Sequence, residues 1–235
     1  MKRARLVIIV AVMIVILSLS GCVKKNYYFS FKAEQSLANS SGEWFPEGTT
    51  YEFTPHGLNL QYGNIACPLR FSGDFTVTVF FEANVDADHR YELGISLGDG
   101  TWHGTTLNDV HMEMYLGDDE NESRYIYDHN EGEIDEYYHY TDSGRIPGIV
   151  RQGFNTYVIK KTGDNISIRI NNVQYADFDL VYYDSEWFGP NLNTYAYDDI
   201  EEGYGITFYD IRVEYTGATS PMPLPEPEAV SLSVN

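Results

Sequence analysis

Along most of the chain, hydrophobic and polar residues alternate with a period of two. Residues 75–81 place four apolar side chains on one face of a predicted strand, and residues 166–170 alternate isoleucine with polar residues. Successive side chains of a β-strand point to opposite faces, so this pattern predicts antiparallel strands with one buried face. The alternation slips in phase between Phe208 and Ile211, which predicts a β-bulge at residues 209–210.

Turn signals separate these runs. Residues 55–57 (Pro-His-Gly), 98–100 (Gly-Asp-Gly) and 171–172 (Asn-Asn) are typical of tight turns. No segment of ten residues carries the apolar stripe of an amphipathic helix. Many short strands joined by regular turns predict a single all-β domain, an antiparallel β-sandwich, from about residue 27 to residue 217.

The N-terminal segment has a different organisation. Three basic residues precede an unbroken apolar run from Leu6 to Leu17. A membrane-spanning helix needs about 20 apolar residues, so this run has the length of a signal-peptide core. The sequence Leu-Ser-Gly-Cys that ends at Cys22 resembles the lipobox of bacterial lipoproteins, which predicts a signal peptide over residues 1–21 and a lipid on Cys22. An ordinary secretory leader or a short anchor helix is the alternative. Only Cys67 then remains, so no intramolecular disulfide is expected.

Composition adds a strong negative charge. The chain has 35 acidic and 15 basic residues, a formal net charge of −20, and three of the basic residues lie in the predicted leader. A protein of this charge repels nucleic acid, so no nucleic-acid partner is expected. Lys24 and Lys25, beside the predicted lipid anchor, are a local exception that we expect near lipid headgroups.

Beyond the leader, the sequence predicts three parts. Residues 22–42 are expected to form a lipidated tether that leads into a first strand, and residues 43–217 are expected to form the sandwich. Residues 218–235 contain PMPLPEPE. Prolines at alternate positions remove backbone donors and favour an extended chain, which predicts a Pro-rich disordered tail.

The order of the predicted strands resembles that of a known superfamily. The segments FSGDFTVTVFFEAN, RYELGISLGDG and NTYVIKKTGDNISIRINNVQ are followed by YGITFYDIRVEY. This series is similar to the concanavalin A-like lectin/glucanase sandwiches, which include laminin-G-like domains and sugar-processing enzymes. The resemblance covers about Gly42 to Gly217 and implies a jelly roll. It contains no catalytic signature, and a fold alone does not assign an activity.

One acidic motif invites comparison with the glucanases of that superfamily. Some of them carry Glu-Ile-Asp-x-x-Glu or Glu-Ile-Asp-x-Glu on one strand, with the first Glu as nucleophile and the last as acid/base. Retaining hydrolysis needs two carboxyl groups about 5–5.5 Å apart, which on a strand requires residues of equal parity. Here Glu131, Glu133 and Asp135 share one parity, whereas Glu136 has the other. We therefore interpret this stretch as a solvated polar insert and assign no catalytic residue.

Sugar binding requires aromatic faces with polar groups around them. Trp102 and His103 follow the Gly-Asp-Gly turn, and Trp187 lies in a stretch that has the composition of a loop. The predicted ligand-binding residues are Trp102, His103, Asp184, Glu186, Trp187 and Asn191. The alternative for each tryptophan is packing, with Trp187 and Phe188 plugging the end of the sandwich.

A metal site is a further possibility at the acidic residues. Calcium takes about six to eight oxygen ligands, and Asp198, Asp199 and Glu201 supply carboxylates close together in the sequence. Their spacing is not that of an EF-hand. We predict Ca²⁺ at these residues as the one candidate cofactor, with solvated acidic loops as the alternative.

These features together favour a lectin-like binding domain in the cell envelope. The lipid on Cys22 would attach it to a bacterial membrane, at the periplasmic face or the cell surface. The expected ligand is a carbohydrate or a protein surface. A glycoside hydrolase or related sugar-processing enzyme is the first alternative, and a structural envelope lipoprotein is the second.

Overall fold

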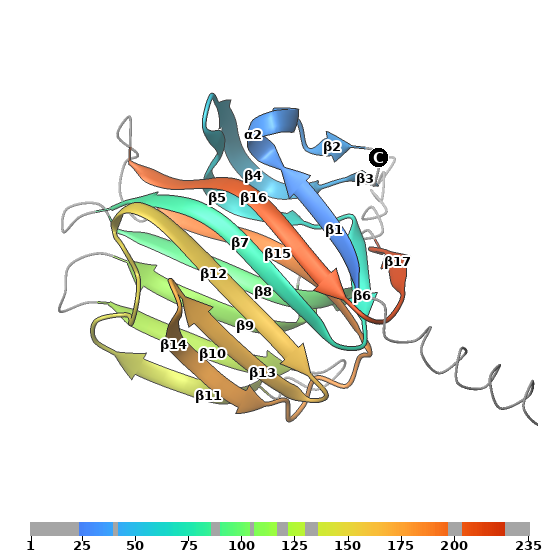
Figure 1. The fold of residues 1–235 in the computed structure, drawn as a ribbon. Helices are drawn as coiled ribbons and strands as arrows, with labels where there is room; N and C mark the ends of the chain where they lie inside the picture. The colour runs from blue at the N-terminus through green and yellow to red at the C-terminus, as the bar shows by residue number, and fades with distance from the viewer. Residues whose placement is uncertain are drawn as a thin grey trace, which may run out of the picture.

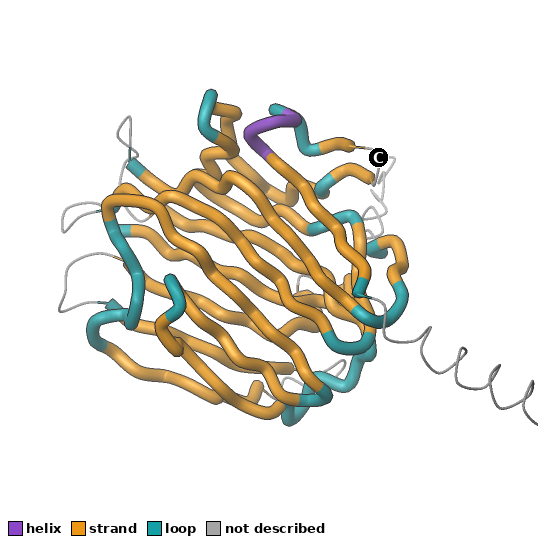
Figure 2. The backbone as a smooth tube through the Cα atoms, in the orientation of Figure 1, coloured by secondary structure: helices purple, strands orange, loops and turns teal. Residues whose placement is uncertain are grey.

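The structure is a computed structural model, and it describes residues 24–39, 42–85, 90–103, 106–116, 122–129, 136–196 and 204–223. Strands dominate this part of the chain, and one short helix, α2 (Phe31–Glu34), follows the first strand (Figure 2). The predicted leader, Cys22 and residues 224–235 lie outside the described residues. Within the described part, no helix is long and apolar enough to cross a membrane. The prediction of an all-β domain is confirmed.

The described strands are β1 (Lys25–Ser30), β2 (Ala38–Asn39), β3 (Gly42–Glu43), β4 (Phe45–Thr54), β5 (Gly57–Ala66), β6 (Leu69–Ser72), β7 (Phe75–Asn84), β8 (Tyr91–His103), β9 (Thr106–Leu116), β10 (Ser123–His129), β11 (Glu136–Ser143), β12 (Gln152–Thr162), β13 (Asn165–Ile170), β14 (Val173–Asp179), β15 (Trp187–Ala196), β16 (Gly205–Tyr215) and β17 (Thr219–Pro221).

These strands form a sandwich of two layers (Figure 1). In the orientation of Figure 1, the front layer contains β1, β16, β7, β12, β13 and β14, and the rear layer contains β5, β15, β8, β9, β10 and β11. Strand β5 joins the layers, because residues 58–60 pair with β16 and residues 62–66 pair with β15. The hairpin of β4 and β5 therefore closes this edge of the sandwich.

Strand β7 shows how the alternating pattern forms this core. Its four alternate apolar residues from Phe75 to Phe81 are buried between the layers. The pairing of β16 with β7 shifts between Phe208 and Asp210, so the predicted bulge is confirmed. The predicted turn at residues 171–172 is also present, and both asparagines have positive φ (49° and 67°).

Aromatic residues fill one end of the core. Phe29, Phe31 and Trp44 are almost completely buried, and their ring centroids lie between 5.0 and 5.7 Å apart. Trp44 is therefore a core residue. Cys67 is a free, buried cysteine, and burial raises the pKa of its thiol to about 12. Its thiol is thus protonated and unreactive at neutral pH.

Segments at both ends of the predicted sandwich pack against it. The first strand expected within residues 22–42 is β1, which begins at Lys25, and Phe31 and Leu37 after it are buried. At the other end, β17 pairs with β6, and the backbone N–H of Met222 donates to the carbonyl of Pro68 at 2.8 Å. Burial of apolar side chains holds both segments against the domain.

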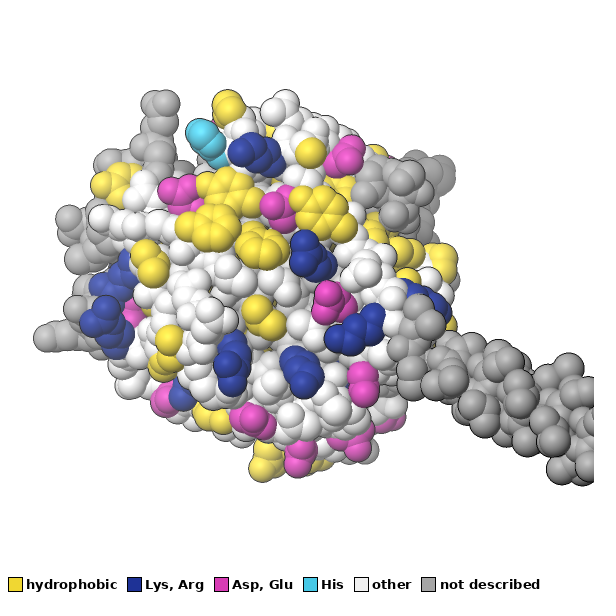
Figure 3. All heavy atoms as spheres, in the orientation of Figure 1, with side chains coloured by type: hydrophobic (Ala, Val, Ile, Leu, Met, Phe, Trp, Pro, Cys, Tyr) yellow, Lys and Arg dark blue, Asp and Glu magenta, His cyan; other side chains and the backbone are white. Residues whose placement is uncertain are grey.

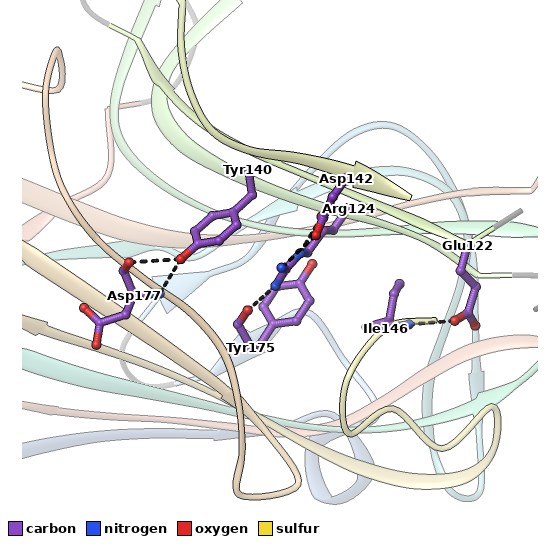
Figure 4. Close-up of polar contacts among 7 residues, drawn as sticks. All are labelled: Glu122, Arg124, Tyr140, Asp142, Ile146, Tyr175 and Asp177. Carbon is purple, nitrogen blue, oxygen red and sulfur yellow. Dashed lines mark hydrogen bonds and ion pairs between the residues drawn. The ribbon is translucent and has the colours of Figure 1, made fainter. Parts of the chain in front are cut away.

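Two strands flank the acidic motif that was interpreted as a polar insert. Strands β10 and β11 pair as a hairpin around residues 130–135, which lie outside the described residues. Some inward side chains of this hairpin are charged. The guanidinium of Arg124 donates to both carboxylate oxygens of Asp142 at 2.6 and 2.9 Å, and it lies 4.6 and 5.1 Å from the ring centroids of Tyr140 and Tyr175 (Figure 4).

This cluster connects the far edges of the two layers. Arg124 of β10 also donates to the carbonyl of Tyr175 on β14, and the hydroxyl of Tyr140 on β11 donates to the carbonyl of Asp177 on β14 at 3.0 Å (Figure 4). Beside it, the fully buried carboxylate of Glu122 accepts hydrogen bonds from Arg151 and from the backbone N–H of Ile146. Hydrogen bonding and ring packing replace apolar contacts here.

Candidate functional site

The outer side of the rear layer carries a line of ionisable side chains on strand β9. Asp109, His111 and Glu113 alternate with Val110 and Met112, which are fully buried in the core. The three ionisable side chains therefore share the opposite face of the strand. His111 Nδ1 lies 3.2 Å from the Asp109 carboxylate, and Nε2 lies 2.8 Å from the Glu113 carboxylate. We call Asp109, His111 and Glu113 the β9 triad.

The geometry of the triad makes His111 a cation. Both ring nitrogens face carboxylates, and only the protonated imidazole has two N–H donors to offer them. Burial opposes the charge of His111, but the hydrogen bonds to Asp109 and Glu113 outweigh it and raise the pKa of His111 to about 10. The ring of Tyr127 stacks on His111 with centroids 5.0 Å apart.

Glu113 is also held by two neighbours. Burial favours its neutral form, but the hydrogen bonds that His111 and the carboxyl group of Glu92 donate to it outweigh this effect, so the pKa of Glu113 is lowered. Glu92 lies on the adjacent strand β8, whose Gly94 pairs with Glu113. The Glu113 carboxylate is thus ionised at neutral pH and keeps 19% side-chain exposure, which leaves an acceptor at the surface.

Strand β15 adds amide groups beside the triad. Asn193 pairs with Gly94 of β8 and with Asn64 of β5. A Cβ atom at Gly94 would lie 1.7 Å from Asn193 Oδ1, so the amide of Asn193 lies directly over the glycine. The Oδ1 atoms of Asn64, Asn191 and Asn193 are shielded from solvent, and within the described structure they have no hydrogen-bond partner. Buried acceptors without a partner are rare and are often satisfied by a ligand or water.

Tyrosines flank these polar groups on both sides. On one side, the rings of Tyr62 and Tyr195 lie 5.1 Å apart and are 47% and 40% exposed. On the other side, the rings of Tyr127 and Tyr138 lie 5.3 Å apart, and Tyr138 is 48% exposed. The outer sides of β5, β15, β8, β9, β10 and β11 thus form one surface of tyrosine, amide and carboxylate groups, which we call the rear face.

One end of the rear face is covered by the C-terminal segment. Added Cβ atoms at Gly189 and Gly100 would lie 2.0 and 2.6 Å from side-chain atoms of Met222, so this methionine fills the space that both glycines leave. Met222 is itself buried. The open part of the rear face therefore lies over Asn193, Glu92 and Glu113.

The structure separates the ligand-binding residues predicted around Trp187. Residues 187–196 form strand β15 and are not a loop, because β15 is paired on both sides. Trp187 is half-buried and Arg70 lies 5.1 Å from its ring centroid, whereas Asp184 and Glu186 are exposed before the strand. Asn191 is buried and donates to Ser96 at 3.3 Å. Only Asn191 belongs to the polar surface beside the triad.

The side chains of the remaining predicted site residues are not described. Trp102 and His103 are in strand β8, but their side chains are not described. Asp198, Asp199 and Glu201, predicted to bind calcium, lie outside the described residues, as do Glu131, Glu133 and Asp135, while Glu136 begins β11. Among the side chains that are described, no three His, Cys, Asp or Glu residues are arranged to hold a metal ion.

The sequence analysis missed the β9 triad. The triad has the i, i+2, i+4 spacing of the Glu-Ile-Asp-x-Glu motif, with Asp109 in place of the first Glu and His111 in place of the Asp. The parity rule that was applied to residues 131–136 selects this segment, because Asp109 and Glu113 share a face. A search that accepted either acid at the first and last positions and any residue between them would have found it.

Figure 3 shows a second aromatic cluster, on the outer side of the front layer. Phe154 is 54% exposed and its ring stacks between those of Phe80 and Tyr209, at centroid distances of 6.2 and 5.5 Å. Tyr28 is 53% exposed, and its hydroxyl donates to Asp210 at 2.8 Å. This cluster is separated from the rear face by the core of the sandwich.

Comparisons with known proteins bear on the fold. No protein-family model matches the sequence, and no curated protein sequence matches it. Among solved structures, the potassium-bound carbohydrate recognition domain of Emp46p aligns with a TM-score of 0.59 and 13% identity, over 85% of this chain and 98% of that domain. An apo Crh5 transglycosylase aligns with a TM-score of 0.53 and 16% identity, over 81% of this chain and 84% of the other.

An enzyme with bound sugar is also similar. The kappa-carrageenase from Pseudoalteromonas carrageenovora, in complex with an oligotetrasaccharide of kappa-carrageenan, aligns with a TM-score of 0.52 and 9% identity, over 83% of this chain and 96% of the enzyme. At these identities the likeness establishes the fold. The chain is a jelly-roll sandwich, which confirms the fold that the resemblance implied.

Proposed function

We propose that this protein is a carbohydrate-binding, lectin-like module whose ligand lies across the rear face, over Asn193, Glu92 and Glu113. We also propose that a lipid on Cys22 holds the module in the bacterial cell envelope, outside the cytoplasm. The observation that carries the first proposal is the combination of shielded, unpartnered amide oxygens with exposed tyrosine rings on one face of the sheet.

The unpartnered oxygens of Asn64 and Asn193 support a ligand with hydroxyl donors. An unsatisfied buried acceptor costs about 1–3 kcal/mol, and a hydroxyl that donates to it would recover part of that cost. A sugar presents several hydroxyl groups on a rigid ring. The carboxylate of Glu113, which stays ionised, adds a charged acceptor to the same surface.

The tyrosines support a ligand with flat, apolar ring faces. Tyr62 and Tyr195 form a pair at one side of the amide groups, and Tyr127 and Tyr138 form a pair at the other. Stacking on an aromatic ring contributes on the order of 1 kcal/mol beyond the area that it buries. Two tyrosine pairs, one on each side of the polar groups, fit an oligosaccharide better than a single sugar.

His111 favours binding over hydrolysis. A glycoside hydrolase needs one carboxyl group with a raised pKa to act as general acid. The pKa of Glu113 is lowered instead, and the ring nitrogens of His111 already bind the carboxylates of Asp109 and Glu113. In this arrangement the triad is a fixed scaffold with one exposed acceptor.

A glycoside hydrolase is the second candidate because the spacing of Asp109 and Glu113 favours it. Two carboxylates at positions i and i+4 of one strand are the pair that retaining hydrolysis uses. Release of reducing sugar from a polysaccharide, lost in both Asp109→Asn and Glu113→Gln variants, would establish the enzyme and reject the binding module.

A glycan array tests the binding proposal. The chain from residue 22 onward with Cys22→Ser contains every described strand and therefore retains the fold. It should bind a subset of glycans, and Tyr195→Ala should weaken that binding about fivefold, as expected for one lost stacking contact. Tyr28→Ala is the matched control, because Tyr28 is 53% exposed on the front layer. Equal losses in the two variants, or no glycan bound at all, would reject the rear face as the site.

A further inference from the structure

An open pocket of about 300 Å³ lies where β1, β7, β12 and β16 meet at one end of the front layer. It is lined by Lys24, Asp74, Phe75, Thr76, Lys160, Lys161, Thr162, Glu214, Tyr215 and Thr216. This pocket is far from the β9 triad in the fold, because its walls come from the other layer. Its lining contains three lysines and two acidic residues, in a chain whose acidic residues outnumber its basic ones 35 to 15.

Strand pairing brings these lysines together from distant parts of the sequence. Lys25 at the start of β1 pairs with Tyr215 at the end of β16. Tyr215 in turn pairs with Phe75 at the start of β7, and Phe75 pairs with Lys161 near the end of β12. The start of the described chain thus lies next to the β12–β13 turn.

The lysines are held by different contacts. Lys25 donates to the carbonyl of Gly217 at 2.9 Å, which fixes the direction of the chain as it enters the domain. Lys161 donates to the carbonyl of Gly163 at 2.6 Å, whereas the side chains of Lys24 and Lys160 are exposed. Lys24 and Lys160 are therefore the lysines that are free to reach a ligand in the pocket.

The charge of the lining suits a single anionic group. The carboxylate of Asp74 already accepts the backbone N–H of Gly163 at 2.9 Å. Lys161 is engaged with Gly163, and its Nζ lies 4.9 Å from the ring centroid of the buried Phe188. Lys24 and Lys160 are therefore the two cations of the lining that can face an anionic group such as a phosphodiester. Hydroxyl groups of Thr76 and Thr162 add hydrogen-bond donors to the same lining, whereas the hydroxyl of Thr216 donates to the carbonyl of Asp74 at 3.2 Å.

We propose that this pocket binds the phosphate of a membrane phospholipid headgroup and so fixes the orientation of the domain on the membrane. The proposal rests on the proposed lipid at Cys22. Lys24 is two residues from Cys22, and an extended chain spans about 3.3–3.6 Å per residue, so the pocket lies on the order of 10 Å from the lipid anchor. The general negative charge of the domain would otherwise push it away from an anionic surface.

Vesicle sedimentation tests the proposal on the unlipidated chain from residue 22 with Cys22→Ser. The vesicles contain phosphatidylcholine with or without phosphatidylglycerol. We expect tighter binding to the vesicles with phosphatidylglycerol, because the choline cation of phosphatidylcholine offsets the charge of its phosphate. Lys24→Gln and Lys160→Gln should each lose about fivefold in affinity, which corresponds to one lysine near an anionic surface. Lys32→Gln is the matched control, because Lys32 is exposed on α2 at the other end of β1.

Three results would overturn the proposal. They are the absence of vesicle binding, an equal loss in the Lys32→Gln control, and binding of free glycerol 3-phosphate by a chain that does not bind vesicles. The last result would assign the pocket to a soluble phosphate compound. The glycan array separates this proposal from the proposed function, because Lys24→Gln and Lys160→Gln leave the rear face intact and should retain glycan binding.

Discussion

The charge on His111 gives a prediction about stability and pH. The pKa of His111 is raised to about 10, above a reference value of about 6.5 in the unfolded chain. The protonated ring therefore stabilises the fold fully below about pH 6.5, and this contribution is lost as the pH rises through 10. At about 1.36 kcal/mol per pKa unit, the difference between the two pKa values of His111 corresponds to at most about 5 kcal/mol of unfolding free energy. The side chain is only 14% exposed, so solvent screens this interaction weakly.

Chemical denaturation between pH 6 and pH 10 measures this contribution. The wild-type chain should lose several kcal/mol of unfolding free energy across this range, and His111→Gln should lose much less, because glutamine carries no proton to release. The difference between the two curves removes the effect of every other titrating group. Parallel curves for the two proteins would show that His111 is neutral in the folded state, and the argument against hydrolysis would then fail.

Three further predictions follow from burial and from the leader. Phe188→Ala should lower the unfolding free energy by about 3–5 kcal/mol, because Phe188 is 1% exposed. Trp187→Ala should lower it by less than half as much, because the ring of Trp187 is half-buried. Equal losses of unfolding free energy in chemical denaturation would contradict the positions of the two rings. Glu122→Ala should cost about 1–3 kcal/mol, since it removes the acceptor of the buried backbone N–H of Ile146, and a melting temperature close to that of the wild type would reject this role. Cys22→Ala should leave an unprocessed, unlipidated precursor in intact-mass measurements, and a processed soluble product would identify an ordinary secretory leader instead.

The sequence predicted the strands whose inward residues are apolar. Strand β7 and the bulge in β16 follow directly from the alternation, because burial of apolar side chains decides both. Strands β10 and β11 were missed, because Arg124 and Asp128 point inward and are satisfied by hydrogen bonds that no local pattern reveals. Asp128 is fully buried and accepts the backbone N–H of Val181 at 2.6 Å, from a segment far along the chain.

The rear face differs from the site residues that the sequence suggested for a related reason. The sequence pointed to tryptophan and to clustered acids, but the rear face is built from single residues contributed by several strands. Asn193, Gly94 and Glu113 lie side by side only after β15, β8 and β9 have paired. Lys24 and Lys160 likewise line one pocket only after the strands have paired, because they are far apart in the sequence. The roles predicted for Trp102, His103 and the calcium residues Asp198, Asp199 and Glu201 stay predictions.

The central claim is that a glycan lies across the rear face. Its most direct test is to map the backbone amide chemical shifts of the ¹⁵N-labelled chain during titration with a glycan selected on the array. We predict shift changes concentrated on β8, β9 and β15, with Gly94, Glu113 and Asn193 among the largest, and little change on the front layer. Changes centred on Tyr28 and Phe154 would place the ligand on the other side of the sandwich and contradict the proposed function.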